Sequence, residues 1–170
     1  MNNHQQKLIY LVGFMGAGKS SVGTVLAQRM GWPFVDLDTV IEAGQGATIR
    51  QIFEHAGEPF FRQVEHAALV EVAKKAPAVI ALGGGTFVQR PNFDLIRQTR
   101  GATIWLDCPI EELWQRCSAM DNRPLFRDRE SFSKLFEQRL PYYRQSEFRI
   151  ATGGRSSEEI AQEILRLGLF

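Results

Sequence analysis

The strongest constraint on the fold is a glycine-rich stretch near the start of the chain. The residues GFMGAGKS, from Gly13 to Ser20, follow a continuous apolar run and precede apolar residues at helical spacing. This order matches the pattern G-x-x-x-x-G-K-[ST] between a strand and a helix. Its glycines let successive backbone N–H groups turn toward phosphate oxygens, and the helix adds the positive end of its dipole. The stretch therefore predicts binding of a nucleoside triphosphate, a plain strand-to-helix turn being the alternative.

Roles can be assigned to individual residues of this stretch. Lys19 supplies a positive charge for the β- and γ-phosphates, and the Ser20 hydroxyl can bind Mg²⁺. The other residues that we expect to contact ATP here are Gly16, Ala17, Gly18 and Ser21.

Short apolar runs alternate with helical patterns along the whole chain. We expect strands at 7–13, 33–38, 78–85, 102–107 and 148–152, and helices at 19–30, 48–57, 58–76, 92–99, 109–120, from 131 to at least 141, and 156–170. This alternation predicts βαβ units, and hence a mainly parallel sheet covered on both faces. Ligands of such sheets bind beyond the carboxyl ends of the strands. A length of 170 residues fits one domain, 1–170.

The composition and the N-terminal residues limit which partners and which cellular compartment we expect for this chain. The formal net charge is +1, so no long-range field favours nucleic acid or an anionic membrane. Cys108 and Cys117 are too far apart for a C-x-x-C redox pair. The N-terminal residues lack a signal-peptide pattern, and no apolar run is long enough to cross a bilayer. We therefore expect a cytoplasmic protein.

Among nucleotide-binding classes, a small-molecule kinase fits best. No aspartate is followed by glycine three residues later, and no Asn-Lys pair occurs, so the elements of a GTPase switch are missing. Motor and helicase ATPases usually need a longer chain.

Aspartates that follow predicted strands are candidates for the transfer chemistry. Asp36 and Asp38 are two residues apart, so in a strand both side chains would face the same side. They could divide the tasks of supporting Mg²⁺ and of orienting or deprotonating an acceptor hydroxyl. The alternative for Asp38 is that it caps the next helix. Asp107, two residues before Pro109, is predicted to cap a helix rather than to support a metal ion.

Three arginines and a glycine triplet add a possible acceptor site. Arg62 and Glu65 are three residues apart and share a helical face, where a surface ion pair is the common outcome. Arg123 and Arg139 each stand before a proline or close to one, and taken singly each predicts a solvated side chain. The glycines at 83–85 follow an apolar run, and their missing side chains could leave room for a substrate. A plain strand exit is the alternative.

Taken in order, these motifs resemble those of shikimate kinases over nearly the whole chain. They are G-x-M-G-A-G-K-S at Gly13, D-x-D-x-x-I-E at Asp36, I-x-x-I-F-x-x-x-G-E-x-x-F-R-x-x-E at Ile49, L-G-G-G at Leu82, R-P-L at Arg123 and R-x-x-x-Y at Arg139. The resemblance implies an α/β fold of the P-loop NTPase class, three-layered and similar to NMP kinases, with a five-stranded parallel sheet. It also implies a mobile lid at about 118–130, an acceptor-binding helical region at about 38–65, and a monomer.

The resemblance also implies a reaction, the Mg²⁺-dependent transfer of the ATP γ-phosphate to the 3-hydroxyl of shikimate in aromatic amino acid biosynthesis. Asp38 would contact the ring hydroxyls as base or orienter, and Asp36 would support Mg²⁺ through water beside Ser20. Lys19 and Arg123 would complete the catalytic set by contacting the phosphates.

Further residues would bind the two substrates. Arg62 and Arg139 would hold the shikimate carboxylate, and the backbone of Gly83, Gly84 and Gly85 would contact the ring. Arg116 and Arg155 would flank the adenine, although IATGGRSSEE lacks the proline that the family often has in this loop.

Two other readings remain open at this point. One is another P-loop kinase, such as a gluconate or nucleoside-monophosphate kinase. The other is a nucleotide-binding regulator without catalysis, which would have no need of Asp38.

Overall fold

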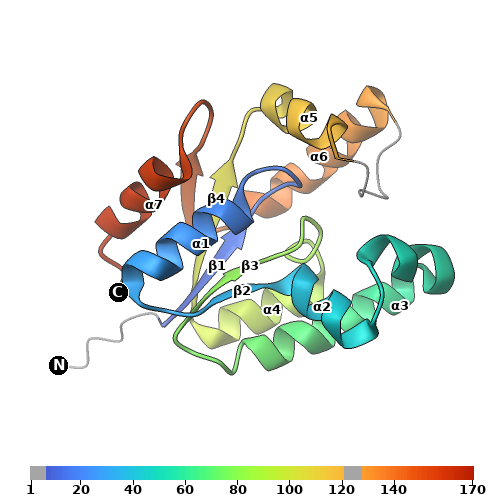
Figure 1. Cartoon of the computed structure of the whole chain (residues 1–170), viewed down its shortest axis with the longest axis horizontal. Helices are drawn as coiled ribbons and strands as arrows, with labels where there is room; N and C mark the ends of the chain where they lie inside the picture. The colour runs from blue at the N-terminus through green and yellow to red at the C-terminus, as the bar shows by residue number, and fades with distance from the viewer. Residues whose placement is uncertain (1–6, 121–127) are drawn as a thin grey trace.

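A single parallel sheet forms the centre of the molecule (Figure 1). The computed structural model describes residues 7–120 and 128–170. Within them, five strands lie in the order β2-β3-β1-β4-β5, and every neighbouring pair is parallel. The strands are β1 (Leu8–Val12), β2 (Phe34–Asp36), β3 (Ala78–Ala81), β4 (Ala102–Asp107) and β5 (Phe148–Ala151). The predicted five-stranded parallel sheet is therefore confirmed.

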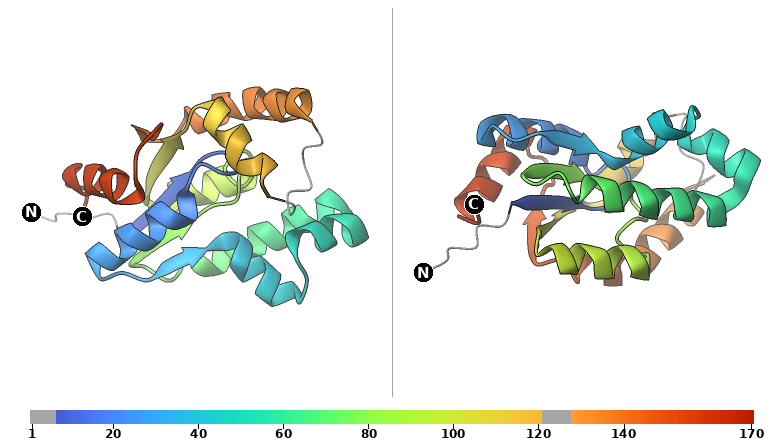
Figure 2. Two further views of the ribbon diagram at one scale, coloured as in Figure 1. Left: turned by 45° about the horizontal axis from the view of Figure 1, so that its top comes forward. Right: turned by 90° about the horizontal axis from the view of Figure 1, so that it is seen from below.

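Helices cover both faces of the sheet, with α1 and α7 on one side and α4 and α6 on the other (Figure 2). Their bounds are α1 (Lys19–Met30), α2 (Leu37–Gln45), α3 (Ile49–Val72), α4 (Arg90–Thr99), α5 (Ile110–Ser118), α6 (Arg129–Tyr143) and α7 (Ser157–Arg166). The central strands β1 and β3 are buried along their whole length, as continuous apolar runs predict for a sheet covered twice. Within the described residues, no helix has both the length and the apolar character that a membrane span requires.

Local signals explain where several helices begin and bend. Thr48 and Ser156 each open a helix through a capping box, with Gln51 and Glu159 as the returning side chains. Within α3, Gly57 has a φ of 80° and interrupts the helical backbone. This φ lies in the left-handed region, which favours glycine, so Gly57 is the residue at which the helix breaks. The break divides α3 into the two helices that the sequence predicts.

The second strand is shorter than predicted, and this changes the placement of Asp38. Strand β2 ends at Asp36, whose side chain caps α2 by accepting a hydrogen bond from the Thr39 backbone nitrogen at 3.3 Å. Asp38 lies in the first turn of α2. The expectation of two carboxylates on one strand face is wrong, because β2 ends at Asp36. The alternative that Asp38 is the cap is also wrong, because Asp36 holds the capping position and bonds to the free N–H of Thr39.

The prediction that Asp107 caps α5 is also wrong. The residue at the cap position is Pro109, and no side chain bonds to the free N–H groups there. Asp107 instead accepts a hydrogen bond from Arg149 of β5, with 2.7 Å between Nε and Oδ2. The pairing of β4 with β5 places Arg149 beside Trp105, two residues before Asp107, and the guanidinium covers the indole ring. A partner 42 residues away along the chain leaves no local sequence signal.

Candidate functional site

The phosphate-binding loop joins β1 to α1 at the carboxyl end of the sheet. Gly16 and Gly18 take φ angles of 81° and 91°, which turn the backbone around the loop. The Lys19 ammonium lies within it and donates to the carbonyls of Gly13 and Phe14 at 2.5 and 3.0 Å. The loop lines a pocket of about 640 Å³ that the side chains of Asp36 and Asp38 also line. The predicted loop residues, Ser20 and Ser21 included, are therefore gathered at one pocket.

Two oxygen groups that could bind a metal ion, the Ser20 hydroxyl and the Asp36 carboxylate, lie together at the end of the loop. The Ser20 hydroxyl donates to Asp36 Oδ2 at 2.5 Å, which joins the start of α1 to the end of β2. A hydroxyl and a carboxylate in one pocket are the hard oxygen ligands that suit Mg²⁺, either directly or through water. The donor set at this point therefore fits the predicted metal ion.

A second, smaller pocket continues from the first. Both are lined by Asp38 and by four further residues, Met15, Ile49, Gly83 and Gly84. We call the smaller one the acceptor pocket; the rest of its lining is Phe53, Phe61, Arg62, Glu65, Gly85 and Arg139. Asp38 thus lies at the junction between the pocket of the phosphate-binding loop and a pocket with two arginines.

The side chains of Asp38, Arg62 and Arg139 approach the backbone of the glycine triplet, 83–85, so closely that a Cβ there would meet them. A Cβ on Gly83 would lie 2.9 Å from Asp38 Oδ1, and one on Gly84 would lie 3.0 Å from Arg139 Nη1. On Gly85 it would lie 2.7 Å from Arg62 Nη2 and 3.0 Å from Arg139 Nη2. The requirement for glycine here is one of space, since none of the three has a positive φ. Both guanidinium groups converge on the same turn.

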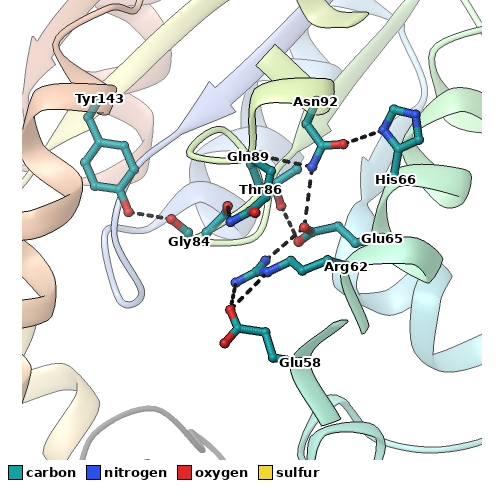
Figure 3. Close-up of polar contacts among 10 residues, drawn as sticks. Glu58, Arg62, Glu65, His66, Gly84, Thr86, Gln89, Asn92 and Tyr143 are labelled. Carbon is teal, nitrogen blue, oxygen red and sulfur yellow. Dashed lines mark hydrogen bonds and ion pairs between the residues drawn. The ribbon is translucent and has the colours of Figure 1, made fainter. Parts of the chain in front are cut away.

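Arg62 is held by carboxylates on its own helix (Figure 3). Its Nη1 donates to Glu65 Oε1 at 2.9 Å, and its Nη2 donates to Glu58 Oε1 at 3.2 Å. The side chain of Glu65 is only 1% exposed and that of Arg62 16% exposed. The Arg62–Glu65 pair is therefore not the surface ion pair that helical spacing alone favours, because this face of α3 turns toward the acceptor pocket.

Glu65 also ties α3 to the glycine turn. Its Oε2 accepts a hydrogen bond from the Thr86 hydroxyl at 2.8 Å, and Thr86 is fully buried. The backbone nitrogen of Thr86 closes the turn on the carbonyl of Gly83 at 3.1 Å. One buried carboxylate thus connects Arg62 to the turn that forms the other side of the acceptor pocket.

Arg139 is buried in α6 rather than solvated as its local sequence favours. Its guanidinium lies over the Phe14 ring at 5.6 Å, and the residue is 6% exposed. Burial lowers the pKa of Arg139; the neighbouring Arg62 charge also lowers it, whereas Tyr143 and Glu65 raise it. The positive charges of Arg62 and Arg139 repel each other. An anion bound between the two guanidinium groups would therefore be stabilised.

Tyr143 fixes the glycine turn from the side of α6. Its hydroxyl donates to the Gly84 carbonyl at 2.5 Å (Figure 3). Burial raises the pKa of Tyr143 far above its ordinary value, so the phenol keeps its proton and remains a donor.

The other predicted ATP contacts lie in different places. Arg116 lines the larger pocket and its Nη1 donates to the Gly16 carbonyl at 2.9 Å. Arg155 turns back onto its own segment, with its guanidinium bonded to the Ala151 carbonyl at 2.7 Å and paired with Glu163 at 2.5 Å. It does not line the larger pocket, although Ser157 does. Arg123 lies outside the described residues.

Several residues of the site had no role in the sequence-based prediction. They are Glu65, Thr86, Asn92 and Tyr143. The R-x-x-E and R-x-x-x-Y spacings contained Glu65 and Tyr143, so a signal for these two existed. Thr86 and Asn92 carry no signal in the sequence, because their partners come from other segments.

The fold and the site together define a P-loop kinase. The phosphate-binding loop faces a carboxylate, and beyond that carboxylate lies a pocket that suits a small anionic acceptor.

Comparison with known proteins identifies the family. The family model described as shikimate kinase matches residues 15–167. A shikimate kinase of Persephonella marina is 41% identical over 158 residues, which cover 92% of this chain and 96% of that relative. One from Moorella thermoacetica is 40% identical over 158 residues, 92% of this chain and 91% of the relative.

A solved structure agrees with the sequence relatives. The shikimate kinase of Acinetobacter baumannii in complex with shikimate superposes with a TM-score of 0.92 at 40% identity, covering 96% of this chain and 93% of that one. The chain belongs to the shikimate kinase family and is an enzyme of the shikimate pathway. The resemblance derived from the motifs is confirmed.

Proposed function

We propose that the chain transfers the γ-phosphate of ATP to the 3-hydroxyl of shikimate, with ATP in the larger pocket and shikimate in the acceptor pocket. The observation that carries the proposal is the position of Asp38 at the junction of the two pockets, with two arginines on its far side. Shikimate is a carboxylate that bears hydroxyls, so arginines at one end and an aspartate at the other are its chemical complement. The A. baumannii relative, solved with shikimate, supports the same assignment.

In this proposal the residues mainly position the reactants, as a loose phosphoryl-transfer transition state requires. Asp38 contacts the ring hydroxyls and orients or deprotonates the attacking one. Arg62 and Arg139 bind the carboxylate, and the backbone of Gly83, Gly84 and Gly85 contacts the ring. Lys19 stabilises the charge on the transferred group.

Mg²⁺ would be held by Ser20, with Asp36 supporting it through water. When bound, it would neutralise negative charge on the phosphates of ATP. The hydrogen bond between the Ser20 hydroxyl and Asp36 supports this placement, because it already brings the two oxygen ligands together.

The remaining ATP contacts are assigned to Gly16, Ala17, Gly18 and Ser21 in the loop, and to Arg116 and Arg123. Arg155, which bonds to Ala151 and Glu163 and does not line the larger pocket, keeps only its sequence-based assignment beside the adenine. We place the lid at about 118–130 and the acceptor-binding helical region at about 38–65 within a single domain, 1–170. We also propose a monomer in the cytoplasm. That compartment keeps thiols reduced, and the side chains of both cysteines, Cys108 and Cys117, are buried.

A coupled ADP-release assay with shikimate, gluconate and AMP as acceptors tests the proposal. Turnover is expected with shikimate and not with the other two. Turnover on gluconate or AMP alone would support another P-loop kinase activity. ATP binding without turnover on any acceptor would support a nucleotide-binding regulator.

A further inference from the structure

A buried asparagine lies behind the acceptor pocket without lining it. Asn92, in the first turn of α4, is 1% exposed. Its amide nitrogen donates to the Thr86 carbonyl at 3.0 Å and to Glu65 Oε1 at 3.4 Å. Figure 3 places its side chain between the glycine turn and α3. Asn92 therefore joins the turn to the carboxylate that holds Arg62.

The orientation of the Asn92 amide depends on a histidine. The amide oxygen is 2.7 Å from Nδ1 of His66, a half-buried residue of α3. Because the nitrogen of the amide already faces two acceptors, its oxygen must face a donor. His66 Nδ1 therefore carries a hydrogen, and His66 donates to Asn92 while Asn92 donates to Glu65. A flipped amide would place its oxygen against the Thr86 carbonyl and the Glu65 carboxylate.

We propose that Asn92 is a positioning residue for acceptor binding, and that His66 acts through it by setting the orientation of the amide. The proposal rests on the proposed function, in which Arg62 binds the acceptor carboxylate. Two of the segments that face the acceptor are α3, with Arg62, and the turn with the glycines. Asn92 bonds to both, so it fixes their relative position, and binding groups displaced by a fraction of an ångström lose much of their effect.

The first test uses Asn92→Leu, with Gln98→Leu as the matched control on an exposed position of the same helix. Leucine has a similar volume and removes the three hydrogen bonds. We expect the shikimate KM to rise about tenfold and the ATP KM to change less than about twofold, a split that a general loss of structure would not give. Gln98→Leu should leave both unchanged. Equal changes in the two KM values, or an unchanged shikimate KM, would overturn the proposal.

The second test asks whether His66 acts through Asn92, and its two single variants do not depend on the folding of Asn92→Leu. His66→Leu removes the donor, whereas His66→Asn can place an amide nitrogen near the position of Nδ1. We expect about a threefold rise in the shikimate KM for the first and near wild-type behaviour for the second. In the Asn92→Leu background, His66→Leu should add nothing. An equal effect of both His66 variants, or full additivity in the double variant, would refute the role of His66.

Measuring Arg62→Ala in parallel distinguishes a failure of the acceptor-pocket assignment from a failure of the role proposed for Asn92. If Arg62→Ala leaves the shikimate KM unchanged, the assignment of the acceptor pocket fails and the inference fails with it. If Arg62→Ala raises that KM and Asn92→Leu does not, the acceptor pocket stands and only the role of Asn92 is refuted.

Discussion

The two sides of the site are built in different ways. The phosphate-binding loop is one stretch, Gly13 to Ser20, and much of its binding capacity lies in backbone N–H groups and the start of α1. The acceptor pocket takes residues from α2, α3, the turn after β3, and α6, and it contains buried charges. Figure 1 shows these segments meeting beyond the carboxyl end of the sheet.

This difference determines how each side should respond to mutation. In the loop, a substitution acts mostly on the group that it removes. On the acceptor side, Arg62 and Thr86 share Glu65 as a partner, so the effects of changing these three residues should be non-additive.

Asp38→Asn should have the largest effect, because Asp38 lines both the pocket of the phosphate-binding loop and the acceptor pocket. Loss of the group that orients or deprotonates the hydroxyl should lower kcat by about 10³-fold, within the usual range for an acid–base residue. The affinity for ATP, measured by calorimetry, should stay within about twofold of wild type. Asp94→Asn, which changes an exposed ion pair on α4, is the control. Nearly intact turnover in Asp38→Asn would show that the assigned role is wrong.

Arg62→Ala should affect the acceptor side alone. Removal of a charge-assisted contact costs about 1.5–3 kcal/mol, so kcat/KM for shikimate should fall by roughly 10- to 150-fold with little change in the ATP KM. The variant also leaves the buried Glu65 without its main cationic partner, which should lower the thermal midpoint.

Arg50→Ala is the matched control for Arg62→Ala, since Arg50 forms an exposed pair with Glu54 on the same helix. An effect of Arg62→Ala on the ATP KM alone would contradict the division of the site into two sides.

Gly84→Ala should weaken shikimate binding more than ATP binding. The added Cβ would lie 3.0 Å from Arg139 Nη1 and 3.4 Å from the Met15 nitrogen, so Arg139 must move. We expect about a tenfold rise in the shikimate KM, equivalent to about 1.4 kcal/mol. Gly44→Ala, at a helical position with open space around it, is the control and should leave both KM values unchanged. A larger effect on ATP would place the triplet on the donor side.

Tyr143→Phe should have the smallest effect. It removes the hydrogen bond to the Gly84 carbonyl, so we expect a loss of about 1 kcal/mol in the free energy of unfolding and a shikimate KM raised by about twofold to fivefold. Denaturant titration and steady-state kinetics measure the two. No change in either would show that this bond contributes nothing to the turn.

The pH dependence of stability gives a second readout for Tyr143. Burial raises the pKa of Tyr143 above its ordinary 10.0, so above that pH the unfolded chain releases a proton that the folded protein keeps. The contribution of this group to stability is complete below pH 10.0 and decreases as the pH rises beyond it. Tyr143→Phe should lose less stability over this range. Tyr10, whose pKa is also raised by burial, is present in both proteins and cancels from the difference.

The sequence alone determined the phosphate-binding loop and most of the fold. The spacing of Gly13, Lys19 and Ser20 is local, and its meaning depends only on a preceding strand and a following helix. Continuous apolar runs, capping boxes and Gly57 likewise act within a few residues of where they stand. These signals were sufficient to predict the parallel sheet and the family.

Only the tertiary structure decided how the acceptor side is assembled. Arg139 is buried and Glu65 bonds to Thr86, 21 residues further along the chain, because folding brings α3, α6 and the turn together. Charged and polar side chains pair with the groups that lie near them in the folded protein, and a single sequence does not show which residues those are. Backbone conformation and apolar periodicity, by contrast, are properties of consecutive residues.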